Sequence, residues 1–284
     1  MKNRAEGVSQ IKKYRIPLLL WLSFEAVAVV LWLALGNLFY LLNFTYIGTA
    51  IAVGLALYVS GFKYARMVVQ LSVGLYMLIY LGVISRENMQ IEGLWYYLSL
   101  GVFEAAVIHY LVAKIGGPLL FGRGWCGYAC WTAMVLDLLP YKTPQKPRHK
   151  KLGWFRVVSF ALSIAYFLVL SRLYPSGLEN LMFISFILGN LIYYAMGIAL
   201  AFACKDNRAF CKYVCPITVF LKPASYFARL RITVDADACI SCGKCKKACP
   251  MDVDMLDNRR NRENGTECIL CFECQKACPK QAIK

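Results

Sequence analysis

The feature that most constrains the fold of this chain is a series of six apolar runs separated by short polar segments. A helix needs about 20 consecutive apolar residues to cross the hydrocarbon core of a bilayer. The runs reach or approach that length and cover residues 16–35, 38–60, 67–84, 94–113, 154–173 and 181–203. The chain is 59% hydrophobic and 17% charged, whereas soluble domains are roughly 45–50% apolar and about 25% charged. We therefore predict a membrane all-α helical bundle of about six spans, with a re-entrant element as an open alternative.

The basic residues predict how these spans are oriented. The net charge is +16, and residues 1–234 hold 23 Lys and Arg against eight Asp and Glu. If the chain starts inside, the segments 1–15, 61–66 and 114–153 carry 14 basic residues, and the opposite loops carry only Arg86 and Arg172. This bias predicts a multi-pass protein of the inner (cytoplasmic) membrane, with both termini and every cysteine on the cytoplasmic side. It also explains the charge without nucleic acid as a partner, and leaves the lipid bilayer as the expected surroundings.

Two cysteine runs near the C-terminus share one spacing. The first reads C-I-S-C-G-K-C-K-K-A-C-P and the second reads C-I-L-C-F-E-C-Q-K-A-C-P. Both match the C-x2-C-x2-C-x3-C-P run of bacterial two-cluster ferredoxins, in which the fourth cysteine ligates the other cluster. The predicted ligands are Cys239, Cys242, Cys245 and Cys278 for one [4Fe–4S] cluster, and Cys268, Cys271, Cys274 and Cys249 for the other. Structural zinc is the alternative, because zinc sites also use C-x2-C pairs.

These runs divide the chain into two predicted domains. Residues 1–232 are expected to form the multispan membrane domain, and residues 233–284 an α+β two-cluster ferredoxin domain. The 13 cysteines are odd in number and mostly clustered, which argues against a disulfide framework. The chemistry predicted for the C-terminal domain is one-electron transfer.

A second type of cysteine pair occurs twice, at the ends of two predicted spans. The two copies read R-G-W-C-G-Y-A-C-W and R-A-F-C-K-Y-V-C-P, and their matching Arg, Tyr and Cys residues are 85 positions apart. A constant offset predicts an internal repeat of a helical hairpin with a surface motif. On a helix, cysteines at i and i+4 share a face, so two faces brought together would offer four thiolates. The four residues are Cys126, Cys130, Cys211 and Cys215.

The role of these four cysteines is open at the sequence level. They could hold a third iron–sulfur centre, or copper, because soft thiolates suit both. They could also be buried, inert thiols among aromatic neighbours such as Trp125 and Phe210. Cys204 has no counterpart in the first copy and is interpreted as structural.

The paired motifs, interleaved with hydrophobic hairpins and followed by two ferredoxin-type runs, resemble the membrane polyferredoxin family. Its members include the quinol dehydrogenase subunit of periplasmic nitrate reduction, the nitrous-oxide reductase regulator and the iron–sulfur cupric reductase. The resemblance covers roughly residues 94–284 and implies a multispan electron-transfer protein with clusters facing the cytoplasm. In that family both pairs usually end in Cys-Pro, and here Trp131 replaces the first proline.

Two acidic residues and a histidine fall inside the predicted spans. Glu25 lies near the middle of the first and Glu104 near the middle of the fourth, with His109 further toward the cytoplasmic face. Acids at that depth are costly unless paired or protonated, and mark functional sites by default. Glu104 and His109 are predicted as a quinone and proton site, since a carboxylate–His pair can accept quinol protons. The alternatives are a neutral glutamic acid hydrogen-bonded between helices and a structural histidine.

The sequence predicts no haem and no flavin within the chain. His109 and His149 are its only histidines, and no C-x-x-C-H run is present, so a bis-His haem b or a haem c has no ligands. A G-x-G-x-x-G between a strand and a helix is also missing. Any such group is expected on a partner.

The leading functional prediction is a membrane-bound electron-transfer protein that relays single electrons between the quinone pool, or a membrane partner, and a redox partner. It would act as the quinol dehydrogenase-like subunit of an oxidoreductase. The alternatives are a cupric reductase that uses the paired cysteines, and a redox-sensing or assembly protein whose clusters do not turn over.

Overall fold

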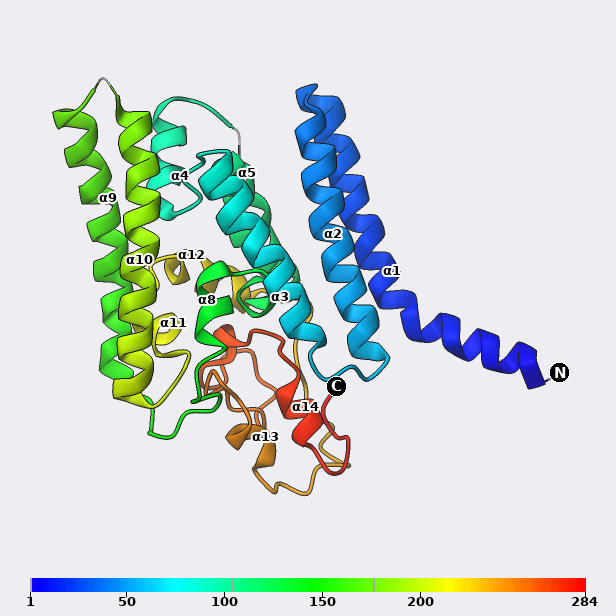
Figure 1. Ribbon diagram of the computed structural model, residues 1–284. Helices are drawn as coiled ribbons and strands as arrows, with labels where there is room; N and C mark the ends of the chain where they lie inside the picture. The colour runs from blue at the N-terminus through cyan, green and yellow to red at the C-terminus, as the bar shows by residue number, and fades with distance from the viewer. Residues whose placement is uncertain (1, 104, 176) are drawn as a thin grey trace. The chain divides into compact units, whose positions relative to one another are not determined.

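The computed structural model describes residues 2–103, 105–175 and 177–284, and its regular structure is helical (Figure 1). The α-helices are α1 (Lys2–Leu35), α2 (Leu38–Val59), α3 (Ala65–Leu75), α4 (Ile91–Ser99), α5 (Ala105–His109), α6 (Gly117–Phe121), α7 (Gly124–Tyr128), α8 (Trp131–Leu136), α9 (Phe155–Leu173), α10 (Leu178–Cys204), α11 (Ala209–Tyr213), α12 (Thr218–Tyr226), α13 (Lys244–Lys247) and α14 (Glu273–Ala277). The π-helical segments are η1 (Tyr76–Ile84) and η2 (Tyr110–Gly116), and the 3-10 segments are η3 (Lys150–Trp154) and η4 (Gly265–Glu267).

The chain divides into two compact units, Met1–Leu75 and Tyr76–Lys284. The second unit contains the ferredoxin-type segment together with the helices that carry the paired cysteines. The predicted domain boundary at residue 232 lies within this second unit. All the cysteines lie in the second unit.

Five of the six expected spans are present among the described residues. The helices long and apolar enough to cross a membrane are Tyr14–Leu35, Leu38–Val59, Ala65–Ile84, Lys150–Leu173 and Leu178–Cys204. These five helices suggest a membrane protein. In the first unit α1 and α2 pack closely at Gly48. A Cβ added at that glycine would lie only 2.5 Å from the Cβ of Phe24.

The fourth expected span, residues 94–113, is not one helix, and this prediction was wrong. Helix α4 ends at Ser99, and Gly101 adopts a left-handed φ of +67°, which a helix interior does not accommodate. The chain resumes as α5, becomes π-helical in η2 and ends at α6, so that Ala106–Phe121 is a shorter apolar helix. Apolar content alone could not reveal a break at a single glycine.

The two copies of the paired-cysteine motif fold alike. Helices α7 and α11 begin and end 85 positions apart, as the repeat predicts. Each helix ends before the second cysteine of its pair, and Cys130 instead lies at the N-terminus of α8. The two cysteines of each pair therefore do not share one continuous helix. Trp131 occupies the first position of α8, where proline is also well tolerated, so tryptophan takes the place of proline without disturbing the turn.

The ferredoxin-type segment also consists of two similar halves, 29 positions apart. Helices α13 and α14 start at Lys244 and Glu273. The expected α+β character is unsupported: no strand occurs in the described part of the chain, where the β pairing of this segment is an isolated antiparallel bridge between Val234 and Ile283. The physical reason is that irregular loops around the cysteines take up most of each half, which leaves too few residues for a ladder.

Candidate metal centres

The first set of four predicted ligands lines one cavity. Cys239, Cys242, Cys245 and Cys278 surround a space of about 340 Å³ whose other walls include Val234 and Ile283. Its lining is apolar apart from the thiols and Lys280. Cys242 is exposed at the rim, whereas Cys245 is buried. The structure thus brings Cys278, from the second run, to the three cysteines of the first.

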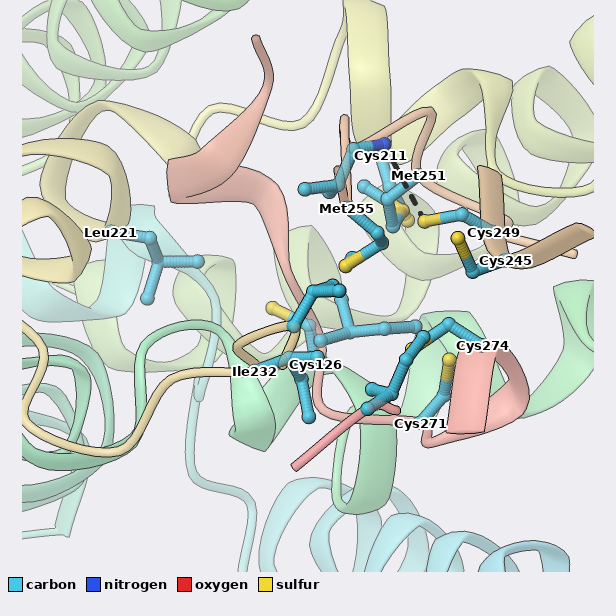
Figure 2. Packing of buried hydrophobic residues seen from close by; sticks show 14 of the residues in the cluster. Cys126, Cys211, Leu221, Ile232, Cys245, Cys249, Met251, Met255, Cys271 and Cys274 are labelled. Carbon is cyan, nitrogen blue, oxygen red and sulfur yellow. Dashed lines mark hydrogen bonds between the residues drawn. The ribbon is translucent and has the colours of Figure 1, made fainter. Parts of the chain in front are cut away.

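The second set lines a separate cavity of about 280 Å³. Its cysteines are Cys249, Cys268, Cys271 and Cys274, and Met251, Met255 and Ile269 complete an apolar wall. Burial raises the pKa of Cys249 to about 12, that of Cys274 to about 12 and that of Cys268 to about 11. Neutral thiols are therefore the stable form unless a metal takes their protons. Figure 2 shows Cys249, Cys271 and Cys274 in one packed group with Met251 and Met255.

Both cavities have the backbone of a cluster-binding loop. Positive φ angles recur at matching positions of the two halves, at Ser241 and Leu270 and again at Asp252 and Gln281. Such angles cost roughly 1–2 kcal/mol per non-glycine residue and persist where the surrounding structure enforces them, typically at ligand clamps. The amides of Val253 and Ala282 donate to the Sγ atoms of Cys249 and Cys278 at 3.4 and 3.3 Å. Hydrogen bonds to sulfur are among the features that set cluster potentials.

The thiols of each set surround a space and do not converge on a point. Within the described ranges no three His, Cys, Asp or Glu side chains lie close enough to hold a single metal ion. In a [4Fe–4S] cluster the thiolates bind different iron atoms at the corners of a cube, so they stand apart. The residues present therefore fit a [4Fe–4S] cluster in each cavity.

The paired cysteines of the two copies also come together. Cys126 and Cys211 are buried in the same apolar core as the ferredoxin-type cysteines (Figure 2). Burial raises the pKa of the Cys130, Cys211 and Cys215 thiols. Neighbouring thiols raise it further: Cys126 acts on Cys130, Cys215 and Cys130 act on Cys211, and Cys126 and Cys130 act on Cys215. The value for Cys211 is about 12. The four thiols thus form one group, which we call the paired-cysteine site.

Two buried arginines link the copies reciprocally. Arg208 donates to the backbone carbonyl of Cys126 at 3.1 Å, and Arg123 donates to that of Cys211 at 3.5 Å. Each side chain is 1% exposed and has a carboxylate partner, which is Asp137 for Arg208 and Glu267 for Arg123. The motif arginine of one copy therefore supports the cysteine of the other.

A third buried cation, Lys114, also faces the paired-cysteine site. It is 3% exposed, and its Nζ lies 5.5 Å from the centroid of the Trp125 ring. Its charge acts against the burial that raises the pKa of Cys130. No described carboxylate pairs with Lys114, whereas the equally buried Lys212 is bound by Asp206 and Asp252 at 2.6 Å each.

Glu267 is the centre of a buried ion-pair network that sequence reasoning missed. It is 1% exposed and accepts hydrogen bonds from Arg123, Arg148 and Arg156. Burial would raise the pKa of its carboxyl, but the guanidinium groups of Arg123, Arg156 and Arg148 hold it at about 2. The sequence contains no spacing that joins these residues. The only available hint is an acidic residue directly before Cys268.

This network attaches the first copy to the loop of the second cavity. The amide of Arg123 donates to the carbonyl of Cys268 at 3.3 Å, and the Tyr128 hydroxyl donates to that of Leu270 at 3.0 Å. A Cβ at Gly127 would lie 2.3 Å from the carbonyl oxygen of Ile269, so only glycine allows this approach. The second cavity is therefore the one next to the paired-cysteine site.

The remaining predicted site residues are distributed as follows. Glu104 lies outside the described residues. His109 is buried with its ring 5.5 Å from that of Trp125 and 6.3 Å from that of Trp131, and no described group bonds its Nε2. Glu25 accepts a hydrogen bond from Thr45 at 2.8 Å, as expected of a glutamic acid hydrogen-bonded between helices. Cys204 ends α10 and is partly exposed.

Comparison with protein families identifies iron–sulfur domains in both regions. Residues 231–279 match the family model of the 4Fe-4S dicluster domain. The model of a 4Fe-4S binding domain matches twice, at residues 107–151 and 182–234, and each match contains one copy of the paired-cysteine motif. The chain is therefore an iron–sulfur, metal-binding protein, and the dicluster match agrees with two [4Fe–4S] clusters.

Two curated proteins are similar to parts of the chain. "Uncharacterized protein MJ0749" of Methanocaldococcus jannaschii is 26% identical over 147 residues, which is 48% of this chain and 54% of that protein. "Putative electron transport protein YccM" of Escherichia coli is 38% identical over 52 residues, which is 18% of this chain and 15% of that protein. The chain thus spans about half the length of the first relative and far less of the second. No solved structure matches the chain.

Proposed function

We propose that this chain is a membrane-bound electron-transfer protein that relays single electrons between the quinone pool and a soluble redox partner. The observation that carries the proposal is one continuous buried core that holds cysteines of both four-cysteine cavities and of the paired-cysteine site. Bound [4Fe–4S] clusters supply one-electron chemistry. The similarity to a protein named for electron transport supports the same function.

The two cavities would hold the two clusters with crossed ligation. Cys239, Cys242, Cys245 and Cys278 would ligate the first cluster, and Cys249, Cys268, Cys271 and Cys274 the second, because these sets line the two cavities. Met251, Met255 and Ile269 would exclude water from the second cluster.

The paired-cysteine site would hold a third centre. Four thiolates carry more negative charge than a bound [4Fe–4S] cluster or a copper ion cancels, so such a centre is anionic. Lys114 would provide the counter-charge, since among the described side chains it has no carboxylate, and Arg123 and Arg208 fix the backbone of Cys211 and Cys126. The match of both motif copies to a 4Fe-4S binding domain favours an iron–sulfur centre over copper.

The membrane end of the relay would exchange electrons with quinone. His109 lies against Trp125 and Trp131, which flank the paired cysteines in sequence. With Glu104 it would exchange protons with the quinone: the pair would accept the protons that a quinol releases on oxidation and supply those that a quinone takes up on reduction. The excess of Lys and Arg in segments 1–15, 61–66 and 114–153 supports an inner-membrane protein with cytoplasmic termini.

The other end of the relay would be the rim of the first cavity. Cys242 is exposed there, and Ile240 beside it is 58% exposed. Lys280 lines the same cavity, Lys244 and Lys247 follow Cys242 closely in sequence, and all three lysines are exposed. A small apolar contact surrounded by lysines suits an acidic soluble carrier, because complementary charge speeds association more than it tightens binding.

The relay is tested by reconstituting the full chain in liposomes that contain decylubiquinone and adding chemically reduced flavodoxin, an acidic carrier. We expect the quinone to be reduced. Replacing both Lys247 and Lys280 by glutamate should slow quinone reduction about tenfold at low ionic strength. The difference in rate from the wild type should shrink as salt screens the charges. The measurement is the initial rate of quinone reduction at several salt concentrations.

The matched control places glutamate at Lys151 and Arg259, which are also exposed but line neither cluster cavity. It should react as the wild type does. Clusters that are reduced and reoxidised while the quinone stays oxidised would contradict the relay and favour the redox-sensing alternative. If both double variants slowed quinone reduction equally, the partner would not bind specifically at the Cys242 rim.

The third centre is tested by metal content. We expect about twelve iron atoms per wild-type chain, and about eight when Cys126 and Cys211 are both replaced by serine, because only the ferredoxin-type clusters then remain. Iron, acid-labile sulfide and copper are measured together in anaerobically purified protein. Serine at Cys204 serves as the control and should retain all the iron. A wild-type content of eight iron atoms with bound copper would instead support cupric reduction.

A further inference from the structure

A cavity between α6, α12 and the ferredoxin-type segment is built from cationic side chains. It measures about 390 Å³ and is lined by Arg231, Arg260 and Arg262, together with Ser225 and Cys268. It is distinct from the two cavities lined by four cysteines. None of the functions assigned above uses its arginines.

The three guanidinium groups are held in place by backbone carbonyls. Arg231 donates to the carbonyl of Asn258 at 2.6 Å, Arg260 to those of Tyr226 and Ala228 at 2.9 and 3.1 Å, and Arg262 to that of Asp257 at 3.3 Å. Each of these contacts occupies only part of a guanidinium with five N–H donors. The remaining donors are left for another acceptor.

The cavity has an excess of positive charge. Within the residues that the structure describes, none of the three arginines forms an ion pair with a carboxylate, and the nearby Asp257 is engaged by Arg259. Burial, together with Arg260 and Arg262, lowers the pKa of Arg231, as expected of cations that repel one another. An anion bound among them would relieve that repulsion.

Ser225 adds an unused polar group to the same cavity. Its side chain is 7% exposed, and its hydroxyl has no hydrogen-bond partner among the described atoms. Buried hydroxyls in native proteins are nearly always hydrogen-bonded. Three anchored guanidinium groups and a free hydroxyl can all donate hydrogen bonds to the oxygens of a phosphate group.

Exposed apolar side chains lie next to the cavity in sequence, and one of them is near the end of a short apolar helix. Leu230 and Phe227 are 60% and 64% exposed, and Leu120, at the end of the apolar helix Ala106–Phe121, is 53% exposed. The amide of Leu230 donates to the carbonyl of Leu120 at 2.7 Å, so the two apolar segments lie side by side. Apolar side chains next to a basic pocket are typical of a site for a lipid headgroup at the membrane surface.

We propose that this cavity binds the phosphate of an anionic phospholipid, with its acyl chains against Leu120, Phe227 and Leu230. A free phosphate would use the same donors but would gain nothing from these apolar side chains. The lipid would fasten the segment between α12 and the first cysteine run to the membrane surface.

The test counts the lipid bound to the full-length protein in neutral detergent by native mass spectrometry. Phosphatidylglycerol, phosphatidylcholine and inorganic phosphate are added in separate titrations. We expect saturable binding of phosphatidylglycerol to this site, and at least tenfold weaker binding when Arg231 and Arg260 are both replaced by glutamine. Phosphatidylcholine and inorganic phosphate should bind at least tenfold more weakly than phosphatidylglycerol to the wild type.

The matched control is Lys151→Gln, which removes an exposed basic residue outside the cavity and should bind phosphatidylglycerol normally. Ser225→Ala provides a second, milder variant and should weaken binding several-fold. Wild-type iron content in every variant shows that the ferredoxin-type segment is folded. Unchanged lipid binding in the double variant would overturn the site, and inorganic phosphate that binds as tightly as the lipid would overturn the lipid assignment.

Discussion

Replacing Cys249 by serine is expected to remove the same cluster that is lost when Cys271 is replaced, although Cys249 belongs to the other cysteine run. The structure places Cys249 in the cavity of Cys268, Cys271 and Cys274. A [4Fe–4S] cluster needs four thiolates, so we expect a loss of about four iron atoms per chain. Iron analysis and electron paramagnetic resonance of the reduced protein measure the loss and identify the cluster.

The control for this prediction is the matching pair of the first cavity. Cys242→Ser and Cys278→Ser should both remove the other cluster, because these residues share a cavity lined by Cys239 and Cys245. Crossed ligation would be wrong if Cys249→Ser removed the resonance that disappears in Cys242→Ser. A zinc protein would show neither iron nor labile sulfide in any of these variants.

Replacing Glu267 by glutamine should destabilise the second unit by about 3–5 kcal/mol, the usual cost of breaking a buried ion pair. The neutral amide would leave Arg123 and Arg156, which are 1% and 4% exposed, without the carboxylate that both contact. Because this residue precedes Cys268, the second cluster should be released first on unfolding. Chemical unfolding in detergent, followed by the visible absorption of the clusters, measures the change.

Glu263→Gln is the matched control for that substitution. Glu263 pairs with Lys150, and the two side chains are 51% and 84% exposed, so its loss should cost about 1 kcal/mol or less. Glu267→Asp keeps the charge and should recover part of the lost stability. If the unfolding free energy of Glu267→Gln lay within about 1 kcal/mol of wild type, the network would not be needed to hold the first motif copy against the loop of the second cavity.

The cysteine sets and the duplicated motif could be predicted because fixed spacing determines them. Three closely spaced cysteines and a crossing fourth impose one geometry, and the 85-residue offset reappears as the equal bounds of α7 and α11. The five spans found among the described residues follow from long apolar runs in the same way.

The rest of the site depends on contacts that no local pattern encodes. Lys114 reads as a loop residue near the end of an apolar run, yet it is buried beside Trp125. Glu267 meets Arg123, Arg148 and Arg156, which lie more than a hundred residues away in sequence. The break near Gly101 depends on one backbone angle, and apolar periodicity does not report such angles.

The exchanged arginine contacts make the two motif copies dependent on each other. Arg123 supports the carbonyl of Cys211 and Arg208 supports that of Cys126, so a single copy would lack both the partner thiols and the donor for its own cysteine carbonyl. Only a second copy, in the same chain or in a neighbouring one, completes the arrangement. A change to the arginine of one copy therefore acts on the cysteine of the other copy, so neither half of the site can be altered alone.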